Sequence, residues 1–547
     1  MAEAFTLADM RDATPVFLLD LTWGGRTFHM STEPIVLSSD DGARPYEGGL
    51  DMPTYRETLD RLQDAIPGQS ASIDVHLPID VTLHRRRGHD PAGATGELSM
   101  VSVKAVPGRL PTSVQTYEKR IRLFKGNVTG AAYDDPEKAS AGWLGFTLEE
   151  PEWEDSGRII PNDARVNETT WPLHLSDHDG KVYPTVIGQP GRFLSSSGTV
   201  SRTHGSPAYV IDTTAGAVKL LIAGHQVVAA TVKVLDSTNF DTFTVTNEAD
   251  GLGRIVATIT ITAGDAIDPT ETEFWASWTD GAAMLSPYAA GVGLTNGGDV
   301  ARWVMSRSTI PQDHGRWAVA GQYINRLEVS TYINDPAATP WDWLADHLLP
   351  LIPISIARSS DGTYPVVYDL DLNRQDMVQI TEGADFRRVG PFTQEGSPSD
   401  VRNDFAIEYA SRAKFSGQYK RRAMLTPEPD SDDSEQFANN YAKLSFARYK
   451  VLQTWAKSTG ILYLEESATQ VLFWMSRLLG FIPETATYTA DHHWAWLRAG
   501  RAVSITEAGA NQTTQAGWVV DRYWNNTHWV YVLLFDDDVP RDVRATN

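Results

Sequence analysis

The chain has 547 residues, too many for one hydrophobic core, so we expect about three to five domains. It has no cysteine, which excludes disulfides, thiolate nucleophiles and cysteine-bound metals. The net charge of −23 argues against a surface that wraps nucleic acid, because phosphate binding needs clustered Lys and Arg. No apolar run is long enough for a membrane span, and no secretory signal opens the chain, so we expect it to be made in a cytoplasm.

The first region, residues 1–155, shows the alternating pattern of β-strands. Residues 16–22 and 27–30 flank Gly24-Gly25, which suits a two-residue hairpin turn. One helix is predicted over residues 54–65, where Leu59 and Leu62 share a face. Further strands are predicted at residues 72–77, 119–128 and 142–148. A β-barrel or sandwich is the expected fold.

The second region, residues 156–300, reads as an inserted all-β module. Its turn signals include His204-Gly205-Ser206-Pro207 and Asp280-Gly281. Strands are predicted at residues 182–187, 217–222, 227–235, 242–246 and 254–262.

Residues 301–425 are predicted to be the first part of a second β domain. A strand is expected over residues 324–333. A short helix is expected over 340–350, with Thr339 as its cap and Pro340 at its first position. Strands 354–357 and 366–369 flank an Asp361-Gly362 turn.

Residues 426–547 are predicted to hold a helical insert and the closing strands of that second domain. Two helices are expected between Asp433 and Leu479, with Ser434 as a cap. Leu472 and Met475 are expected on the buried face of the second helix. Strands are predicted at residues 403–410, 497–506, 517–523 and 528–535. The predicted fold class is therefore mainly β with a smaller α part (α+β), in several domains.

Three clusters of chemistry-bearing residues stand out, and each has a structural alternative. The acids of residues 149–155 offer paired carboxylates, but they lie on a Pro-broken loop and favour a solvated turn. Asp177-His178-Asp179 offers metal-capable groups without a metal motif, which favours a turn. His492-His493 lacks a zinc-binding helix and favours a loop rim or an interface. We therefore assign no catalytic, cofactor-binding or metal-binding residue.

Two further features each have a structural and a functional interpretation. Trp518, Trp524 and Trp529 suit core packing, with sugar stacking as the alternative. The basic run of residues 84–87 suits a solvated loop tip, with contact to an acidic neighbouring subunit as the alternative. No nucleophile elbow, phosphate-binding loop or dinucleotide fingerprint is present in the sequence.

The order of elements in the last third of the chain resembles the tail hub proteins of long-tailed bacteriophages and of gene transfer agents. The strand 403–410, a helical insert, the strand 497–506 and a closing hairpin follow the family layout. Residues 343–349, Asp361-Gly362 and 378–383 resemble the family's short helix, turn and following strand. Residues 121–128 resemble a strand of the accompanying N-terminal barrel.

This resemblance implies a structural, non-enzymatic virion protein of the tail tip or baseplate. It implies a homotrimer whose two similar barrels per subunit form a pseudo-sixfold ring. The implied partners are the distal tail ring, the tape measure protein and the central tail fibre, with DNA passing through the lumen without specific binding. No cofactor and no membrane insertion are implied. The alternatives are a tail-associated carbohydrate-active enzyme and a receptor-binding module.

Overall fold

Separate stretches of sequence combine into two units in the computed structural model of the chain. Unit 1 comprises Met1–Trp153, Ser355–Glu395 and Pro483–Asp538, and unit 2 comprises Glu154–Ile354, Gly396–Ile482 and Val539–Asn547. The division of the sequence at residues 155, 300 and 425 stays a prediction. The structure describes residues 13–59, 70–76, 93–104, 112–133, 143–149, 155–194, 198–214, 216–236, 240–278, 284–359, 362–368, 377–383, 386–394, 396–415, 417–430, 433, 435–506 and 514–535.

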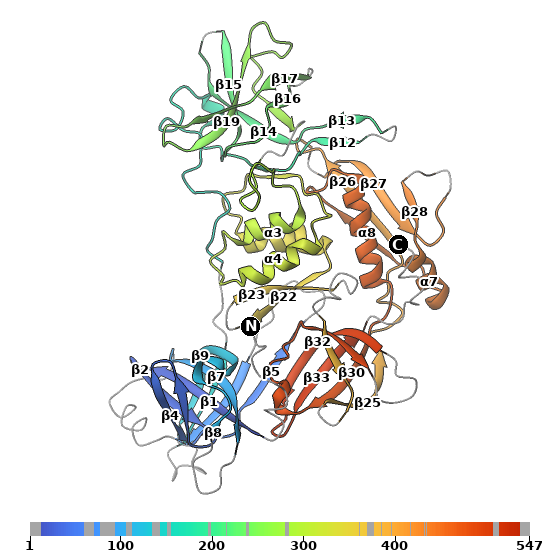
Figure 1. Cartoon of the computed structure of the whole chain (residues 1–547). Coiled ribbons are helices and arrows are strands. Elements are labelled where there is room, and N and C mark those ends of the chain that lie inside the picture. Colours follow the sequence, from blue (N-terminus) through green and yellow to red (C-terminus); the bar gives the residue numbers. More distant parts are fainter. Residues whose placement is uncertain are drawn as a thin grey trace. The chain divides into compact units, whose positions relative to one another are not determined.

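The predicted fold class is confirmed: the chain is mainly β with a smaller α part, and its sheets include two half-barrels. Both half-barrels belong to unit 1 and share one 16-stranded sheet (Figure 1). The strands of the first half-barrel are β1 (Thr14–Trp23), β2 (Arg26–Ser31), β3 (Ile35–Ser39), β4 (Gly42–Gly48), β5 (Thr54–Thr58), β6 (Ser70–His76), β7 (Thr95–Lys104), β8 (Thr112–Ser113), β9 (Ile121–Tyr133) and β10 (Trp143–Glu149).

The second half-barrel is assembled from two distant stretches of the chain. Its strands are β24 (Val378–Thr381), β25 (Phe386–Gln394), β30 (Glu484–Ala490), β31 (Ala502–Thr506), β32 (Thr514–Trp524) and β33 (Trp529–Phe535). The strands β22 (Ile354–Ser359) and β23 (Gly362–Val367) form a separate two-stranded sheet. The closing hairpin predicted from the sequence corresponds to β32 and β33, which pair antiparallel.

The two half-barrels are joined through β5 and β32. These strands pair antiparallel, with Arg522 opposite Glu57 and Tyr523 opposite Arg56. A single hydrophobic core runs through both, from Phe17 on β1 to Phe535 on β33. The predicted helix over 54–65 is therefore wrong in its first part, because Thr54–Thr58 is strand β5; residues 60–65 lie outside the described residues.

Strand β1 is buried on both of its faces. Phe17, Leu19 and Leu21 point into the main core of unit 1. Val16 and Leu18 point to the other face, where they pack with the β3–β4 hairpin in a second, smaller core. The alternation of a strand places Asp20 and Thr22 on this second face, next to the small core.

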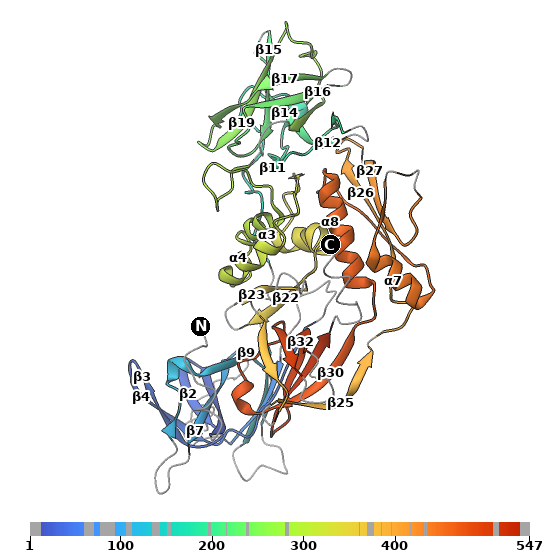
Figure 2. The same ribbon diagram turned by 45° about the vertical axis from the view of Figure 1, so that its right-hand side comes forward.

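Unit 2 contains a second large β-sheet; the module predicted over residues 156–300 stays a prediction. Seven strands form this sheet, and its core contains aliphatic residues together with Phe243, Phe274 and Trp278 (Figure 2). In sheet order they are β17 (Phe240–Thr244), β16 (Thr231–Leu235), β20 (Phe274–Trp278), β14 (Ser206–Asp212), β15 (Ala217–Ala223), β19 (Ile255–Thr262) and β18 (Thr246–Ala249). Short pairs nearby are β11 (Thr185–Ile187) with β21 (Thr331–Ile333), and β12 (Arg192–Leu194) with β13 (Val200–Arg202).

Three α-helices precede residue 344 in the described part of unit 2, and the sequence predicts only one of them. Helix α5 (Pro340–Trp343) has the expected cap, because the Thr339 side chain accepts from the backbone N–H of Asp342. A π-helical turn, η4 (Leu344–Leu348), continues it. Helices α3 (Gly297–Met305) and α4 (His314–Tyr323) were not predicted. The strand predicted over 324–333 is reduced to β21.

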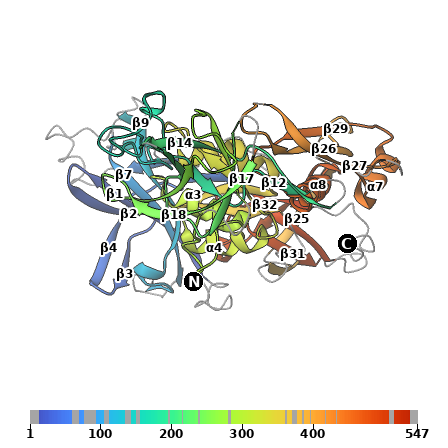
Figure 3. The ribbon, with the colours of Figure 1, turned by 90° about the horizontal axis from the view of Figure 1, so that it is seen from above.

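The last part of unit 2 pairs a four-stranded sheet with a long helix (Figure 3). The strands in sheet order are β28 (Gln436–Ala438), β27 (Tyr419–Thr426), β26 (Asp404–Ser411) and β29 (Thr454–Ser458). Helix α8 (Glu465–Leu479) contacts β26 and β27. Leu472 and Met475 are buried as predicted. Helix α7 (Asn440–Tyr449) is capped by Asn439; the predicted cap Ser434 lies outside the described residues.

Among the described residues, no helix is both long and apolar enough to cross a bilayer.

Candidate functional site

A buried ion pair lies at the junction of the two half-barrels in unit 1. The Arg522 guanidinium on β32 donates from Nε to the Glu57 carboxylate on β5. Its Nη1 donates to the carbonyl oxygens of Ala495 and Leu497 at 2.7 and 2.9 Å. Arg522 and Glu57 are 0% and 2% exposed, so neither charge is solvated and Arg522 depends on this carboxylate. Glu57 also lies 3.7 Å from Arg498 Nη1.

Tyr55 extends this junction network across β5. Arg522 Nη2 donates to the Tyr55 hydroxyl at 3.1 Å, and that hydroxyl lies 3.1 Å from Glu57 Oε2. Arg498 Nη1 donates to the carbonyl of Leu123 at 2.7 Å, which links the second half-barrel to β9. Burial and the nearby Glu57 raise the pKa of Tyr55 to about 12, so the phenol stays neutral. The junction is thus fixed in one register by charge and by hydrogen bonds.

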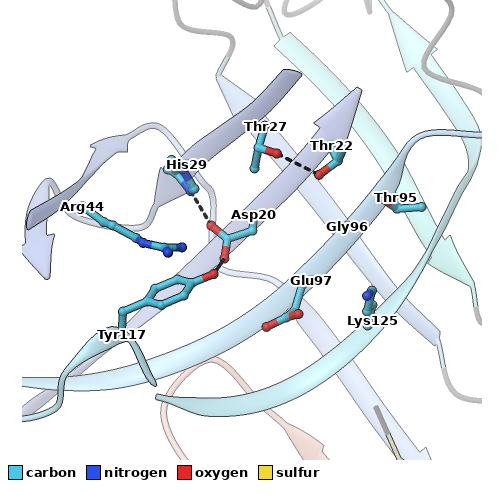
Figure 4. A pocket seen from close by; sticks show the side chains of 10 residues that line it. All are labelled: Asp20, Thr22, Thr27, His29, Arg44, Thr95, Gly96, Glu97, Tyr117 and Lys125. Carbon is cyan, nitrogen blue, oxygen red and sulfur yellow. Dashed lines mark hydrogen bonds and ion pairs between the residues drawn. The ribbon is translucent and has the colours of Figure 1, made fainter. Parts of the chain in front are cut away.

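A polar pocket of about 350 Å³ opens beside the β3–β4 hairpin of the first half-barrel (Figure 4). At its base, Asp20 Oδ1 accepts from the Tyr46 hydroxyl at 2.8 Å and lies 2.6 Å from His29 Nδ1. Its Oδ2 accepts from the Tyr117 hydroxyl at 3.1 Å. Burial alone would raise the pKa of Asp20, but the bonds from His29 and Tyr46 outweigh it, so this pKa lies below its ordinary value.

Two guanidinium groups enclose the ring of Tyr117. Arg44 lies 3.8 Å and Arg120 lies 3.7 Å from the ring centroid. Arg120 is almost fully buried, forms an ion pair with Glu97, and places its Nη2 3.8 Å from Asp20 Oδ2. These contacts tie the η1 turn (Tyr117–Lys119), the hairpin and the sheet together around one charged centre.

Hydroxyl groups and one lysine complete the walls of the pocket. Thr22 and Thr27 form a cross-strand hydrogen bond of 3.0 Å between β1 and β2. Thr95 lies on β7, and Lys125 lies on β9, directly opposite Glu97 in the strand register. The described lining residues are Asp20, Thr22, Thr27, His29, Arg44, Thr95, Gly96, Glu97, Tyr117 and Lys125, and none has an aliphatic side chain.

The acidic segment 149–155 does not bring paired carboxylates together in the described residues. Glu149 ends strand β10 in unit 1, and residues 150–154 lie outside the described residues. Asp155 belongs to unit 2, where its Oδ1 accepts backbone N–H groups of Gly157 and Thr309 and its Oδ2 accepts that of Trp341. This carboxylate thus joins three segments of chain, as a structural acid does.

The Asp177-His178-Asp179 segment is the predicted turn, in the form of the 3-10 turn η3 (Ser176–His178). His178 is buried, and its Nδ1 accepts the backbone N–H of Val210 at 2.7 Å. Burial lowers the pKa of His178 and favours the neutral ring that this bond requires. Within the described residues, no three His, Asp or Glu side chains gather as a metal site would require.

His492 and His493 are buried rather than exposed at a rim, so that interpretation is wrong. They form the 3-10 turn η6 (His492–Trp494) and pack edge to face. Trp518, Trp524 and Trp529 are at most 4% exposed, which confirms core packing. The basic run of residues 84–87 lies outside the described residues.

The sequence interpretation missed both the junction network and the pocket. One signal was present: Asp20 interrupts an apolar strand, and Arg522 interrupts another. A charge at such a position must find a buried partner, but the partners Glu57 and Arg120 lie far away in sequence.

No model of a known protein family matches the sequence, and no curated protein matches it. Several solved structures align with most of its length. A tail protein from Neisseria meningitidis MC58 aligns with 95% of this chain and 97% of its own, at 7% identity and a TM-score of 0.35. The 43 kDa tail protein of prophage MuSo2 from Shewanella oneidensis aligns over 96% of this chain and 99% of its own length, at 9% identity and a TM-score of 0.35. A chain from the virion of a native gene transfer agent aligns over 70% of this chain and 90% of its own length, at 11% identity and a TM-score of 0.37.

Proposed function

We propose that this chain is a structural subunit of a phage tail tip or baseplate, and within it the hub. In this proposal three copies form a pseudo-sixfold ring that joins the tail tube and distal tail ring to the central tip and lets DNA pass. The observation that carries the proposal is the pair of half-barrels fused into one sheet and one core. Each copy thereby presents two barrel elements as one body, so three copies present six.

The energetics of the junction support a fixed pair of half-barrels. Separating β5 from β32 would break the buried ion pair between Arg522 and Glu57. Breaking such a buried pair costs several kcal/mol, about 3–5 for the loss of one partner. The two half-barrels therefore act as a preassembled unit rather than as two domains on a linker.

The ends of the same sheet offer surfaces for association. In the described part of the chain, β25 pairs with β30 alone and forms one end of the sheet path. Val389 on β25 is 51% exposed, and the strand carries a bulge between Val389 and Thr393. Open sheet edges pair readily with other chains. A head-to-tail contact that closes after three copies produces a ring.

The charge of the chain suits a channel through which DNA moves. Each copy carries −23, from 70 acidic and 47 basic residues. A wall of the same sign as DNA does not retain it, whereas clustered Lys and Arg would neutralise phosphates and bind it. The distal tail ring, the tape measure protein and the central fibre are the proposed partners. The proposed role is structural and needs no catalytic residue.

Light scattering of the purified chain, alone and with its ring partner, tests this proposal. We expect a particle of three times the 60.3 kDa chain mass. Val389→Lys should weaken assembly, because it places a charge on the exposed end of the sheet. Val319→Lys, on the similarly exposed Val319 of α4, is the matched control and should assemble normally. A chain that stays monomeric with its partner contradicts the proposal.

A further inference from the structure

We infer that the polar pocket beside the β3–β4 hairpin binds one acidic sugar unit, a hydroxylated ring that carries a phosphate or a carboxylate. The inference depends only on unit 1 and is independent of the proposed hub role. The pocket is about 350 Å³, near the lower end of the roughly 300–1,000 Å³ typical of ligand sites. That size suits a single sugar ring rather than a larger ligand.

Both carboxylates of the pocket already have hydrogen-bond and ion-pair partners within the protein. Asp20 is 8% exposed, and its two oxygens are approached by His29, Tyr46 and Tyr117. Glu97 accepts from Arg120 and lies 3.4 Å from Arg122 Nε. Arg120 lies close to both acids, so its guanidinium occupies the position that a metal ion between them would need. The two carboxylates therefore do not attract a cationic ligand.

Two cationic side chains of the pocket, Lys125 and Arg44, retain capacity to bind an anion. Lys125 is exposed and faces Glu97 in the register of β7 and β9, yet its ammonium has no ion-pair or hydrogen-bond partner among the described residues. Arg44 forms a long ion pair, with 3.4 Å between its Nη2 and Asp41 Oδ2, and the Asp41 side chain is 87% exposed. Two cationic groups thus reach the pocket in a chain whose net charge is −23. Together they suit an oxyanion.

The remaining walls suit the hydroxyl groups of a sugar. Thr22, Thr27 and Thr95 each present a hydroxyl, and the Thr22–Thr27 bond leaves further acceptor and donor capacity. Both faces of the Tyr117 ring are covered by Arg44 and Arg120, so the ring does not offer an apolar stacking platform. The described lining side chains are mainly polar, which disfavours an apolar ligand.

Isothermal calorimetry on the purified full chain tests the inference, with glucose 6-phosphate, glucuronate, glucose and inorganic phosphate as probes. We expect glucose 6-phosphate or glucuronate to bind more tightly than glucose and than inorganic phosphate. The tighter of the two identifies the anionic group. Lys125→Gln should weaken that binding about tenfold or more, because one charge-assisted hydrogen bond is lost. Lys125→Arg should retain most of it.

Lys104→Gln is the matched control, because Lys104 is exposed at the far end of β7 from Thr95. Its binding and its urea unfolding midpoint should match those of the natural chain. Lys125→Gln should also keep the natural midpoint, since Lys125 is exposed. The inference is overturned if no charged sugar binds, if glucose or inorganic phosphate binds as tightly, or if Lys104→Gln weakens binding equally.

Discussion

Arg522 is a fully buried cation whose charge is held by one acid and by several oxygens. Burial by itself would lower the pKa of Arg522, but Glu57 and the neighbouring hydroxyls raise it, so the guanidinium remains protonated. Its bonds to Ala495 and Leu497 also fix the backbone that precedes β31. The residue therefore stabilises the junction and selects its register.

We expect Arg522→Met to lower the free energy of unfolding by about 3–5 kcal/mol, because Glu57 stays buried and only the more distant Arg498, at 3.7 Å, is left to offset its charge. Chemical denaturation of the full chain measures this. The matched control is Arg56→Met, which removes the other ion pair between β5 and β32. Arg56 lies 2.7 Å from Asp521 but is 65% exposed, so its loss should cost under about 1 kcal/mol.

The double variant Arg522→Met with Glu57→Leu separates charge from packing. It should recover much of the lost stability, since apolar side chains can replace a buried pair. Equal losses for Arg522→Met and Arg56→Met would show that the junction does not depend on the buried charge.

Asp20 makes the first half-barrel sensitive to acid. Its pKa is depressed in the folded chain, so its contribution to stability is present above the ordinary carboxyl pKa of about 3.9. That contribution is lost as the pH falls through the lower folded pKa. The stability difference between the natural chain and Asp20→Asn should therefore be largest near neutral pH and shrink below about pH 4. A difference that is constant from pH 7 to pH 3 would contradict this account of Asp20.

At the scale of elements, local signals predict the parts that depend on local physics. The β1–β2 turn follows from Gly24 and Gly25, which both adopt positive φ as a tight hairpin requires. The start of α5 follows from Thr339 and Pro340. The faces of α8 follow from helical spacing, because its apolar residues repeat along one side.

Elements that depend on distant partners were missed or predicted wrongly. Leu59 and Leu62 have helical spacing, but the strand at Thr54–Thr58 is determined by pairing with β32, more than 460 residues away in sequence. Helix α4 has Gly at two positions and a weak apolar face, which gave no periodic signal. The pocket is built by β1, β2, β4, β7, η1 and β9, so no local spacing in the sequence describes it.

We expect Leu472→Ala to cost about 2–5 kcal/mol, because this α8 side chain is fully buried and its removal leaves a cavity. Leu452→Ala is the matched control, since Leu452 is 60% exposed and its loss should change stability by well under about 1 kcal/mol. Urea unfolding of the full chain compares the two. Similar small effects would show that the α8 side chain is not held in a close-packed core.

At the scale of the whole molecule, the chain combines a fused pair of half-barrels with a strongly acidic composition. A fused pair suits a ring element that must match a sixfold tube with three copies. In the proposed channel, an acidic wall would repel DNA of the same charge, and this repulsion would act within a screening length of about 8 Å at physiological salt. The proposed sugar site on the first half-barrel is independent of the proposed ring.

The most direct test of the hub proposal is a cryo-electron microscopy map of the assembled particle that contains this chain. The account predicts three copies around the tail axis, with six half-barrels surrounding an open channel and acidic side chains on its wall. A map that places the chain away from the axis, or in any number of copies that does not form such a ring, would contradict it.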